Sequence, residues 1–385
     1  MRKNWLTKNL LLLSAVSLAQ DAASELLYPL MPLIVAALVG SAPLVLGLVE
    51  GLAEATAGLT KLLSGRAADK YGAKRFVVAG YSVAGIGKAL VVTAVTWPAV
   101  LAGRVVDRLG KGLRSAPRDA LIGVGIEDKD LGKAFGFHRM SDTLGAVIGP
   151  LLALGGLALL NNDFRAVAAW ALIPAMLSAL LTLFITKDNR APKAATPSPF
   201  ANKTPLPAGL KRNIAALAII QLANIPDALL LLRLHDIGFS AVGIVLSYAL
   251  YNLVAVSAAL PAGALADRLG AGKIYALGLI VFAAAYATLG LSNNTIIVVA
   301  AIALYGLFPA LTDGVGKAWV SKQAPTAIRG KAQGWYQALM NFAVLAAGLW
   351  GGLFWTKGTS QPVLVVAAAI SLLGAIWLWR KQTTE

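Results

Sequence analysis

Acidic side chains stand inside apolar segments of this sequence, where charge is costly. Asp21 and Glu25 lie one helical turn apart in an apolar run that begins near Leu10, and Ser24 and Tyr28 share their helical face. Acids in such segments face a cavity or a partner rather than lipid. Two carboxylates close together in a dehydrated site repel each other, so one of them can take up a proton near neutral pH. The spacing therefore points to proton chemistry.

Basic side chains follow the same helical periodicity and could compete with a proton for a carboxylate. We hypothesise that the first pair of acids, with Glu50 or Glu54, carries the proton, and that Arg104 or Arg108 displaces it. Static ion pairs that only fix helix packing are the alternative. The candidate proton-coupling residues are Asp21, Glu25, Glu50, Glu54, Arg104, Asp107, Arg108, His138, Arg139 and Asp142.

The segments that carry these residues have the length of membrane-spanning helices. Of the 385 residues, 58% are hydrophobic and 14% are charged, which is too apolar for a soluble domain. Apolar runs of about 20 residues recur, and no strict alternation suggests a β-barrel. We predict an all-α membrane protein with twelve spans, near residues 10–36, 43–63, 76–96, 98–120, 134–160, 165–186, 212–235, 241–262, 274–291, 295–316, 331–355 and 362–379.

The net charge of +16 is distributed as a membrane topology requires. Basic residues gather in alternate loops, which predicts that both termini lie in the cytoplasm. Nucleic acid is therefore not an expected partner. We read the first span as retained rather than as a signal peptide. The chain has no cysteine, so a disulfide or a thiolate metal site is excluded, and we predict no cofactor and no bound metal.

The chain is built from two related halves. A segment rich in proline, alanine and lysine predicts a cytoplasmic linker at 189–211 between six-helix bundles at 1–188 and 212–385. Short matches recur in order, among them "QDA" at 20–22 with "PDA" at 226–228, and "GRAADKYGAK" at 65–74 with "GALADRLGAG" at 263–272. Parallel six-helix repeats predict a transporter with its site near mid-membrane between the repeats.

Several motifs resemble those of the major facilitator superfamily of secondary transporters. The two loops after spans two and eight are similar to its G-x-L-A-D-R-x-G-R-K motif, and Leu101-x-x-Arg104 is similar to its L-x-x-R motif. Gly145, Gly149 and Pro150 match the first part of the motif associated with its antiporters. The resemblance implies the twelve-helix fold of that family. The gate candidates are Gly65, Asp69, Lys70, Gly72, Lys74, Gly263, Asp267, Arg268 and Gly270.

The second half keeps few of the buried charges. If charges served only the symmetry of the fold, both repeats should keep them, so we expect ion coupling in the first half and an aromatic substrate surface in the second. The candidate substrate-cavity residues are Tyr28, Asn224, Asp227, Arg233, Tyr248, Tyr251, Asn252, Trp335 and Tyr336. Arg233 has a second reading, because it lies near the end of its span and can snorkel to the interface.

The resemblance to bacterial drug and small-molecule exporters implies efflux of a small organic solute by proton antiport, by a monomer in the cytoplasmic membrane. Proton-coupled import is the alternative. A divalent-metal or metal-chelate exporter is a lesser one, because His138 lies near several acids. An enzyme is not expected, since the sequence has no ATP-binding loop and no water-soluble domain. A channel is disfavoured because a polar stripe is missing from spans nine and twelve.

Overall fold

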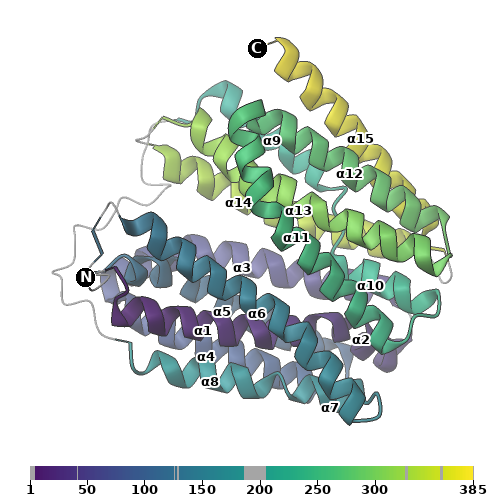
Figure 1. The fold of residues 1–385 in the computed structure, drawn as a ribbon, viewed down its shortest axis with the longest axis horizontal. Coiled ribbons are helices and arrows are strands. Elements are labelled where there is room, and N and C mark those ends of the chain that lie inside the picture. Colours follow the sequence, from purple (N-terminus) through teal and green to yellow (C-terminus); the bar gives the residue numbers. More distant parts are fainter. Residues whose placement is uncertain are drawn as a thin grey trace. The chain divides into compact units, whose positions relative to one another are not determined.

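The computed structural model describes residues 5–40, 42–124, 126–127, 130–185, 205–325, 328–355 and 359–384, and this part of the chain is almost entirely helical (Figure 1). The helices are α1 (Lys8–Leu27), η1 (Tyr28–Leu30), α2 (Met31–Val39), α3 (Pro43–Tyr71), α4 (Ala73–Val92), α5 (Trp97–Ile122), α6 (Leu131–Leu159), α7 (Phe164–Ala169), α8 (Leu172–Thr182), α9 (Ala208–Gln221), α10 (Asp227–Asp236), α11 (Ala241–Leu269), α12 (Ala271–Leu291), α13 (Thr295–Gln323), α14 (Arg329–Phe354) and α15 (Gln361–Thr384).

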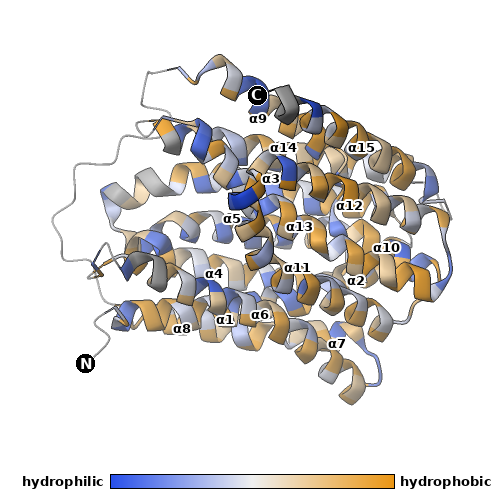
Figure 2. Ribbon diagram, turned by 45° about the horizontal axis from the view of Figure 1, so that its top comes forward, coloured by the Kyte–Doolittle hydropathy of each residue, from blue (hydrophilic) through white to orange (hydrophobic). Residues whose placement is uncertain are grey.

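These helices account for the twelve predicted spans. Ten segments of the described chain are long and apolar enough to cross a membrane, with α1–α2 and α7–α8 each forming one segment. The ten segments do not include α5, α9 and α10. Helix α5 has 26 residues but carries many charges, and α9 and α10 are short, with 14 and 10 residues. Figure 2 shows apolar residues along most of the helices, and large apolar side chains such as Leu260 and Ile296 are exposed. Such faces suit lipid.

Prolines interrupt the first helix of each half. Pro29 and Pro32 lie where α1 passes through the short 3-10 helix η1 into α2. Pro226 directly precedes α10, after the turn that ends α9. Proline lacks a backbone N–H and cannot continue the hydrogen-bond ladder, which explains both interruptions. The equivalent acids Asp21 and Asp227 lie close to these breaks, two turns before η1 and at the first residue of α10.

The chain divides into two compact units, 1–40 with 52–198, and 41–51 with 199–385. The division differs from the predicted boundary at Ser41–Gly51, which groups with the second unit although α3 continues into the first. Within the second unit Gly47 lies against Gly348, where an added Cβ would come within 2.1 Å of the carbonyl oxygen. Residues 189–204 of the predicted linker at 189–211 lie outside the described part of the chain.

Glycines allow the helices of the first unit to pack closely. A Cβ on Gly87 would lie 2.3 Å from the amide nitrogen of Asp107, and a Cβ on Gly110 would lie 2.5 Å from the carbonyl oxygen of Gly80. Small residues bring α4 and α5 into backbone contact, as is typical of membrane helices. In the second unit α12 packs against α13 and α15, and α11 packs against α13.

Candidate functional site

A polar network joins four helices of the first unit. The hydroxyl of Ser17 on α1 lies 2.9 Å from that of Tyr81 on α4 and accepts a hydrogen bond from Arg118 on α5 at 3.0 Å. The imidazole of His138 on α6 lies 3.4 Å from the same hydroxyl. Asp142, one turn further along α6, is 3.9 Å from Arg118 and 3.7 Å from His138. The network brings together two basic side chains, an acid and two hydroxyl groups in one largely buried region.

Asp21 lies one helical turn beyond Ser17 on the same face of α1. Its charged neighbours are one acid, Asp142, and three bases, Arg114, Lys111 and Arg118. The carboxylate therefore lies beside a second carboxylate and within an excess of positive charge. Repulsion between the acids and attraction to the bases make proton occupancy of this pair sensitive to small movements of the helices.

The antiporter-like glycines lie against these acids. A Cβ on Gly145 of α6 would be 2.5 Å from the carbonyl oxygen of Leu18 and 3.0 Å from the Cβ of Asp21. A Cβ on Gly149 would be 2.7 Å from the Cβ of Glu25. Pro150 lies inside α6 directly after them. The glycines thus hold α6 against the acidic face of α1, and any larger residue would separate the two helices.

A second charged group is sealed between α4 and α5. Lys88 donates a hydrogen bond to Asp107 at 2.6 Å, and Arg104 lies 3.4 Å from the other carboxylate oxygen. The three side chains are 1%, 2% and 4% exposed for Lys88, Arg104 and Asp107. The guanidinium of Arg104 also lies 5.7 Å from the ring centre of Tyr28. This triad has the burial and pairing of a structural ion cluster.

The candidate acids and bases are distributed over α1, α3, α5 and α6. Glu54 pairs with Arg108 at 3.0 Å, and its other charged neighbours are Lys111, Arg104 and Asp107. Glu50 is buried in the segment that belongs to the second unit. Arg139 is exposed, unlike its neighbour His138. The hypothesis of a single acid cluster stays a prediction: Asp21 has Asp142 as a charged neighbour, and Asp21 and Glu54 both have Lys111 as a charged neighbour.

Several members of these groups were not among the predicted site residues. Ser17, Tyr81 and Arg118 complete the network around His138. Lys88 is the base that neutralises Asp107. A lone lysine in an apolar span was the available signal for Lys88, because such a charge needs a partner. Neutral hydroxyl groups carry no comparable signal in a sequence.

In the second unit the carboxylate of Asp227 is held by neutral groups. Tyr305 on α13 donates a hydrogen bond to one oxygen at 2.6 Å, and Tyr251 on α11 donates to the other at 3.2 Å. The hydroxyl of Tyr305 is also 3.3 Å from Asn224. Tyr251 stacks between Tyr248 and Tyr305, at ring-centre distances of 5.9 and 5.2 Å. Asn224, Asp227, Tyr248 and Tyr251 were predicted, whereas Tyr305 was not.

Of the other predicted cavity residues, Tyr28 belongs to the first unit and the rest lie in this unit. Arg233 is buried and bonds to the end of α12, at 3.4 Å from the carbonyl oxygens of Leu289 and Ser292. It satisfies carbonyl groups that the helix end leaves without partners. Tyr336 is buried and hydrogen-bonded to Tyr275. Trp335 is exposed. The side-chain amide of Asn252 donates a hydrogen bond to the backbone carbonyl of Tyr248.

The two gate candidates share their backbone geometry. Gly72 and Gly270 have φ of +93° and +96° at the junctions of α3 with α4 and of α11 with α12, where residues with a Cβ are strained. Lys74 donates to the carbonyl oxygen of Leu183 at 3.1 Å. Asp267 pairs with Lys322 on α13 at 2.9 Å and does not cap a helix.

The remaining gate positions make fewer contacts. The ammonium of Lys70 lies 5.0 Å from the ring centre of neighbouring Tyr71. Arg268 is exposed, and a Cβ on Gly263 would meet no atom within 4 Å. Gly65 and Asp69 lie in helix α3, and the structure describes nothing else of these two residues.

Comparison with known proteins identifies the family. A sequence profile of the Major Facilitator Superfamily matches residues 13–231 and 214–385. An uncharacterized MFS-type transporter of Methanocaldococcus jannaschii is 31% identical over 391 residues, which cover 97% of this chain and 94% of that protein. The chain belongs to the major facilitator superfamily.

Other members of the superfamily share parts or all of its length. The multidrug resistance protein MdtH of Salmonella typhi is 32% identical over 158 residues, 41% of this chain and 39% of that protein. A mutant of the nucleoside transporter NupG has a TM-score of 0.82 at 16% identity, covering 97% of this chain and 99% of its own. The peptide transporter POT in complex with sulfate has a TM-score of 0.81 at 15% identity, over 98% and 94%. At these identities the solved structures show the fold.

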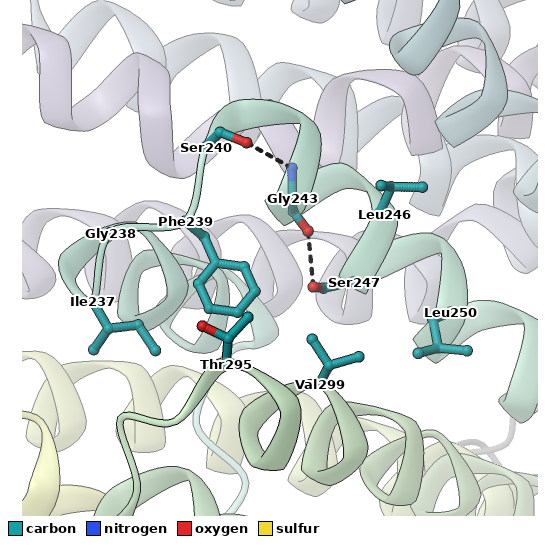
Figure 3. Close-up of a pocket in the computed structure, with 10 residues that line it drawn as sticks. All are labelled: Ile237, Gly238, Phe239, Ser240, Gly243, Leu246, Ser247, Leu250, Thr295 and Val299. Carbon is teal, nitrogen blue, oxygen red and sulfur yellow. Dashed lines mark hydrogen bonds between the residues drawn. The ribbon is translucent and has the colours of Figure 1, made fainter.

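This major facilitator protein also has a pocket of about 610 Å³ beside the loop between α10 and α11. Its walls are mostly apolar, from residues such as Phe239, Leu246 and Val299 (Figure 3). Ser240 accepts a hydrogen bond from the Gly243 amide, and the Ser247 hydroxyl donates to the Gly243 carbonyl, so these hydroxyls are already engaged. No predicted site residue of the transporter lines this pocket.

A metal site finds no support in the part of this transporter that the structure describes. Within those residues no group of three or more histidine, cysteine, aspartate or glutamate side chains could hold a metal ion. His138 instead contacts the hydroxyls of Ser14 and Ser17 at 3.4 Å each.

Proposed function

We propose that the protein is a secondary transporter that exchanges protons for a small organic solute by alternating access in the cytoplasmic membrane. The observation that carries this proposal is the pair of acids Asp21 and Asp142, placed on two helices within reach of the same arginine, Arg118. Membership of a transporter family supports transport rather than catalysis. The proposal includes protons and a small organic molecule as partners, a monomeric protein and cytoplasmic termini, since basic loops alternate along the chain.

The coupling step follows from the contacts of Arg118. Its guanidinium bonds to Ser17 at 3.0 Å and to Asp119 at 3.0 Å, while Asp142 lies 3.9 Å away. When both acids are ionised, they attract this arginine and the bases of α5 toward α1 and α6. A proton on either acid removes part of that attraction, and the arginine can then favour its other partners. Protonation thus changes which helices are tied together, as a coupled transporter requires.

The direction of transport rests on two further observations. The glycines of the antiporter-like motif pack against the two acids of α1, so the motif and the acids act on one helix contact. A relative of partial length is named a multidrug resistance protein. Both favour efflux by proton antiport, with proton-coupled import as the second candidate.

Proteoliposomes that contain the purified protein and a trapped pH indicator test the proposal. External addition of an aromatic cation, an aromatic anion, a zwitterion and a neutral solute, one at a time, exposes the carrier to each charge class. Antiport predicts that an entering substrate drives protons out, so the lumen becomes alkaline, while symport predicts that it becomes acidic. A response that follows a sodium gradient, or no response to any class beyond that of protein-free liposomes, contradicts the proposal.

Asp21→Asn separates coupling from solute movement. We expect this variant to lose the pH response while it still exchanges labelled for unlabelled solute across the membrane. Asp163→Asn is the matched control, because Asp163 only caps α7 and an asparagine can accept the same backbone hydrogen bonds. An Asp21→Asn protein that moves protons like the wild type would remove Asp21 from the mechanism.

A further inference from the structure

Asp227 is an acid that no described base of the second unit neutralises. Its two oxygens accept hydrogen bonds from Tyr305 and Tyr251, both of which are neutral. Its charged neighbours are Asp313 and Glu50, which are also acids. Among the described residues no basic side chain forms an ion pair with it. A partly buried carboxylate in such surroundings needs a positive charge from outside this set of residues, which a proton or a bound cation can supply.

The surroundings of the carboxylate are aromatic. Tyr248, Tyr251 and Tyr305 form a stacked row, with ring planes 24° and 19° apart between successive rings. Phe282 and Tyr286 extend the aromatic group, with ring centres 5.9 and 5.4 Å from that of Tyr305. The faces of aromatic rings carry partial negative charge and attract cations, most strongly where water is excluded. The stacked rings cover each other's faces here, so it is the carboxylate within this aromatic group that favours an organic cation over an anion.

One edge of this group is partly exposed. Asn224, Asp227 and Tyr251 are half-buried, whereas Tyr248 and Tyr305 are buried. A ligand at this edge would meet the carboxylate, the edge of the Tyr251 ring and the amide of Asn224. The buried rings hold the tyrosine hydroxyls in place, so the carboxylate keeps a fixed direction. A fixed carboxylate reduces the ordering cost of binding.

We infer that Asp227, held by Tyr251, binds the positively charged group of a lipophilic organic cation, either a protonated amine or a quaternary onium centre. This inference rests on the proposed transport function and names the class of its substrate. The carboxylate supplies the charge attraction, and the Tyr251 hydroxyl, which donates to it at 3.2 Å, holds it in place. The acids Glu50 and Asp313 add to the negative potential at the same place.

Direct binding tests the inference without any transport. The probes are tetraphenylphosphonium and tetraphenylborate, which have the same shape and opposite charge, titrated into purified protein by calorimetry. We expect the phosphonium to bind and the borate not to bind. Asp227→Asn should weaken phosphonium binding about tenfold or more, as loss of a charged contact does. Asp227→Glu, which keeps the charge, should retain most of the affinity, and Asp163→Asn should match the wild type.

The hydrogen bond that holds the carboxylate is tested separately from the charge. Tyr251→Phe keeps the stacked ring and removes the hydroxyl that donates to Asp227, so it should lower the affinity for the phosphonium several-fold. Equal binding of both probes, no binding of the phosphonium, or an Asp227→Asn protein that binds it like the wild type would overturn the inference. None of these binding results decides whether transport is coupled to protons, which the liposome test measures. Conversely, a missing pH response in liposomes would contradict proton coupling but would not account for selective binding of the phosphonium.

Discussion

Replacing Asp107 by asparagine should destabilise the first unit strongly. The change keeps the size of the side chain and removes the one negative charge of the triad, in which Lys88 and Arg104 lie 2.6 and 3.4 Å from the carboxylate oxygens. At an effective dielectric constant of about 20, these distances correspond to roughly 6 and 5 kcal/mol of attraction before desolvation is subtracted. Removing one member of a buried ion pair costs about 3–5 kcal/mol in unfolding free energy, and we expect Asp107→Asn to fall in this range.

The partner variant gives the comparison. Lys88→Met removes one cation but leaves Asp107 paired with Arg104, so we expect a smaller loss, close to the 1.5–3 kcal/mol of a charged hydrogen bond. In the double variant Lys88→Met/Asp107→Asn, Arg104 is the one cation of the triad that has lost the Asp107 carboxylate. The double variant should therefore have a higher free energy of unfolding than Asp107→Asn alone. The losses in free energy of unfolding of the two single variants should not add.

The measurement is unfolding of the purified protein in mixed micelles by increasing SDS, followed by the fluorescence of its 9 tryptophans. Asp163→Asn, which preserves a helix cap, should change the unfolding free energy by less than about 0.5 kcal/mol. If Asp107→Asn also stays within that margin, or if the losses of the single variants add in the double variant, the triad is not a coupled ion cluster. The reasoning from its distances and burial would then be refuted.

The same unfolding measurement checks three further changes. Gly149→Val should cost several kcal/mol, because its Cβ would lie 2.7 Å from the carbonyl oxygen of Ala22, whereas Gly155→Val on the same helix meets nothing within 4 Å and should be mild. Gly270→Ala should cost about 1–3 kcal/mol because φ is +96°, while Gly314→Ala inside α13 should be neutral or stabilising; equal effects would exclude backbone strain as the cause. Arg233→Met should cost about 1–3 kcal/mol by leaving carbonyl groups at the end of α12 without a donor, and an unchanged midpoint would exclude that role.

Local rules of sequence predicted the helices well. Apolar runs of bilayer length mark the spans because every backbone group must bond within the helix in lipid. The matching loops of the two halves placed Gly72 and Gly270 correctly at tight turns, and the family resemblance implied the fold. The spacing of Gly145 and Gly149 indicated a bend or close packing, and the structure shows close packing against α1.

Pairing between helices was harder to predict. Periodicity shows which residues share a face of one helix, but it does not show which helix lies opposite. Asp107 therefore looked available for proton exchange, although Lys88 from α4 neutralises it. Tyr305 lies 78 residues from Asp227 in the sequence, and an isolated tyrosine in an apolar span gives no sign of the partner it will meet. Long-range contacts of neutral groups are the part that the sequence alone does not reveal.

The repeat places Asp21 and Asp227 at equivalent positions, yet their surroundings have opposite electrical character. Asp21 has bases on α5 as neighbours besides one acid, so its own unit can balance its charge. Among the described residues, Asp227 has neutral hydroxyls as its side-chain hydrogen-bond partners and acids as its charged neighbours. Fold symmetry alone would have kept the two environments alike. Their divergence assigns different tasks to the two acids, because the first can exchange a proton for a built-in base, whereas the second requires a positive charge that a proton or a ligand must bring.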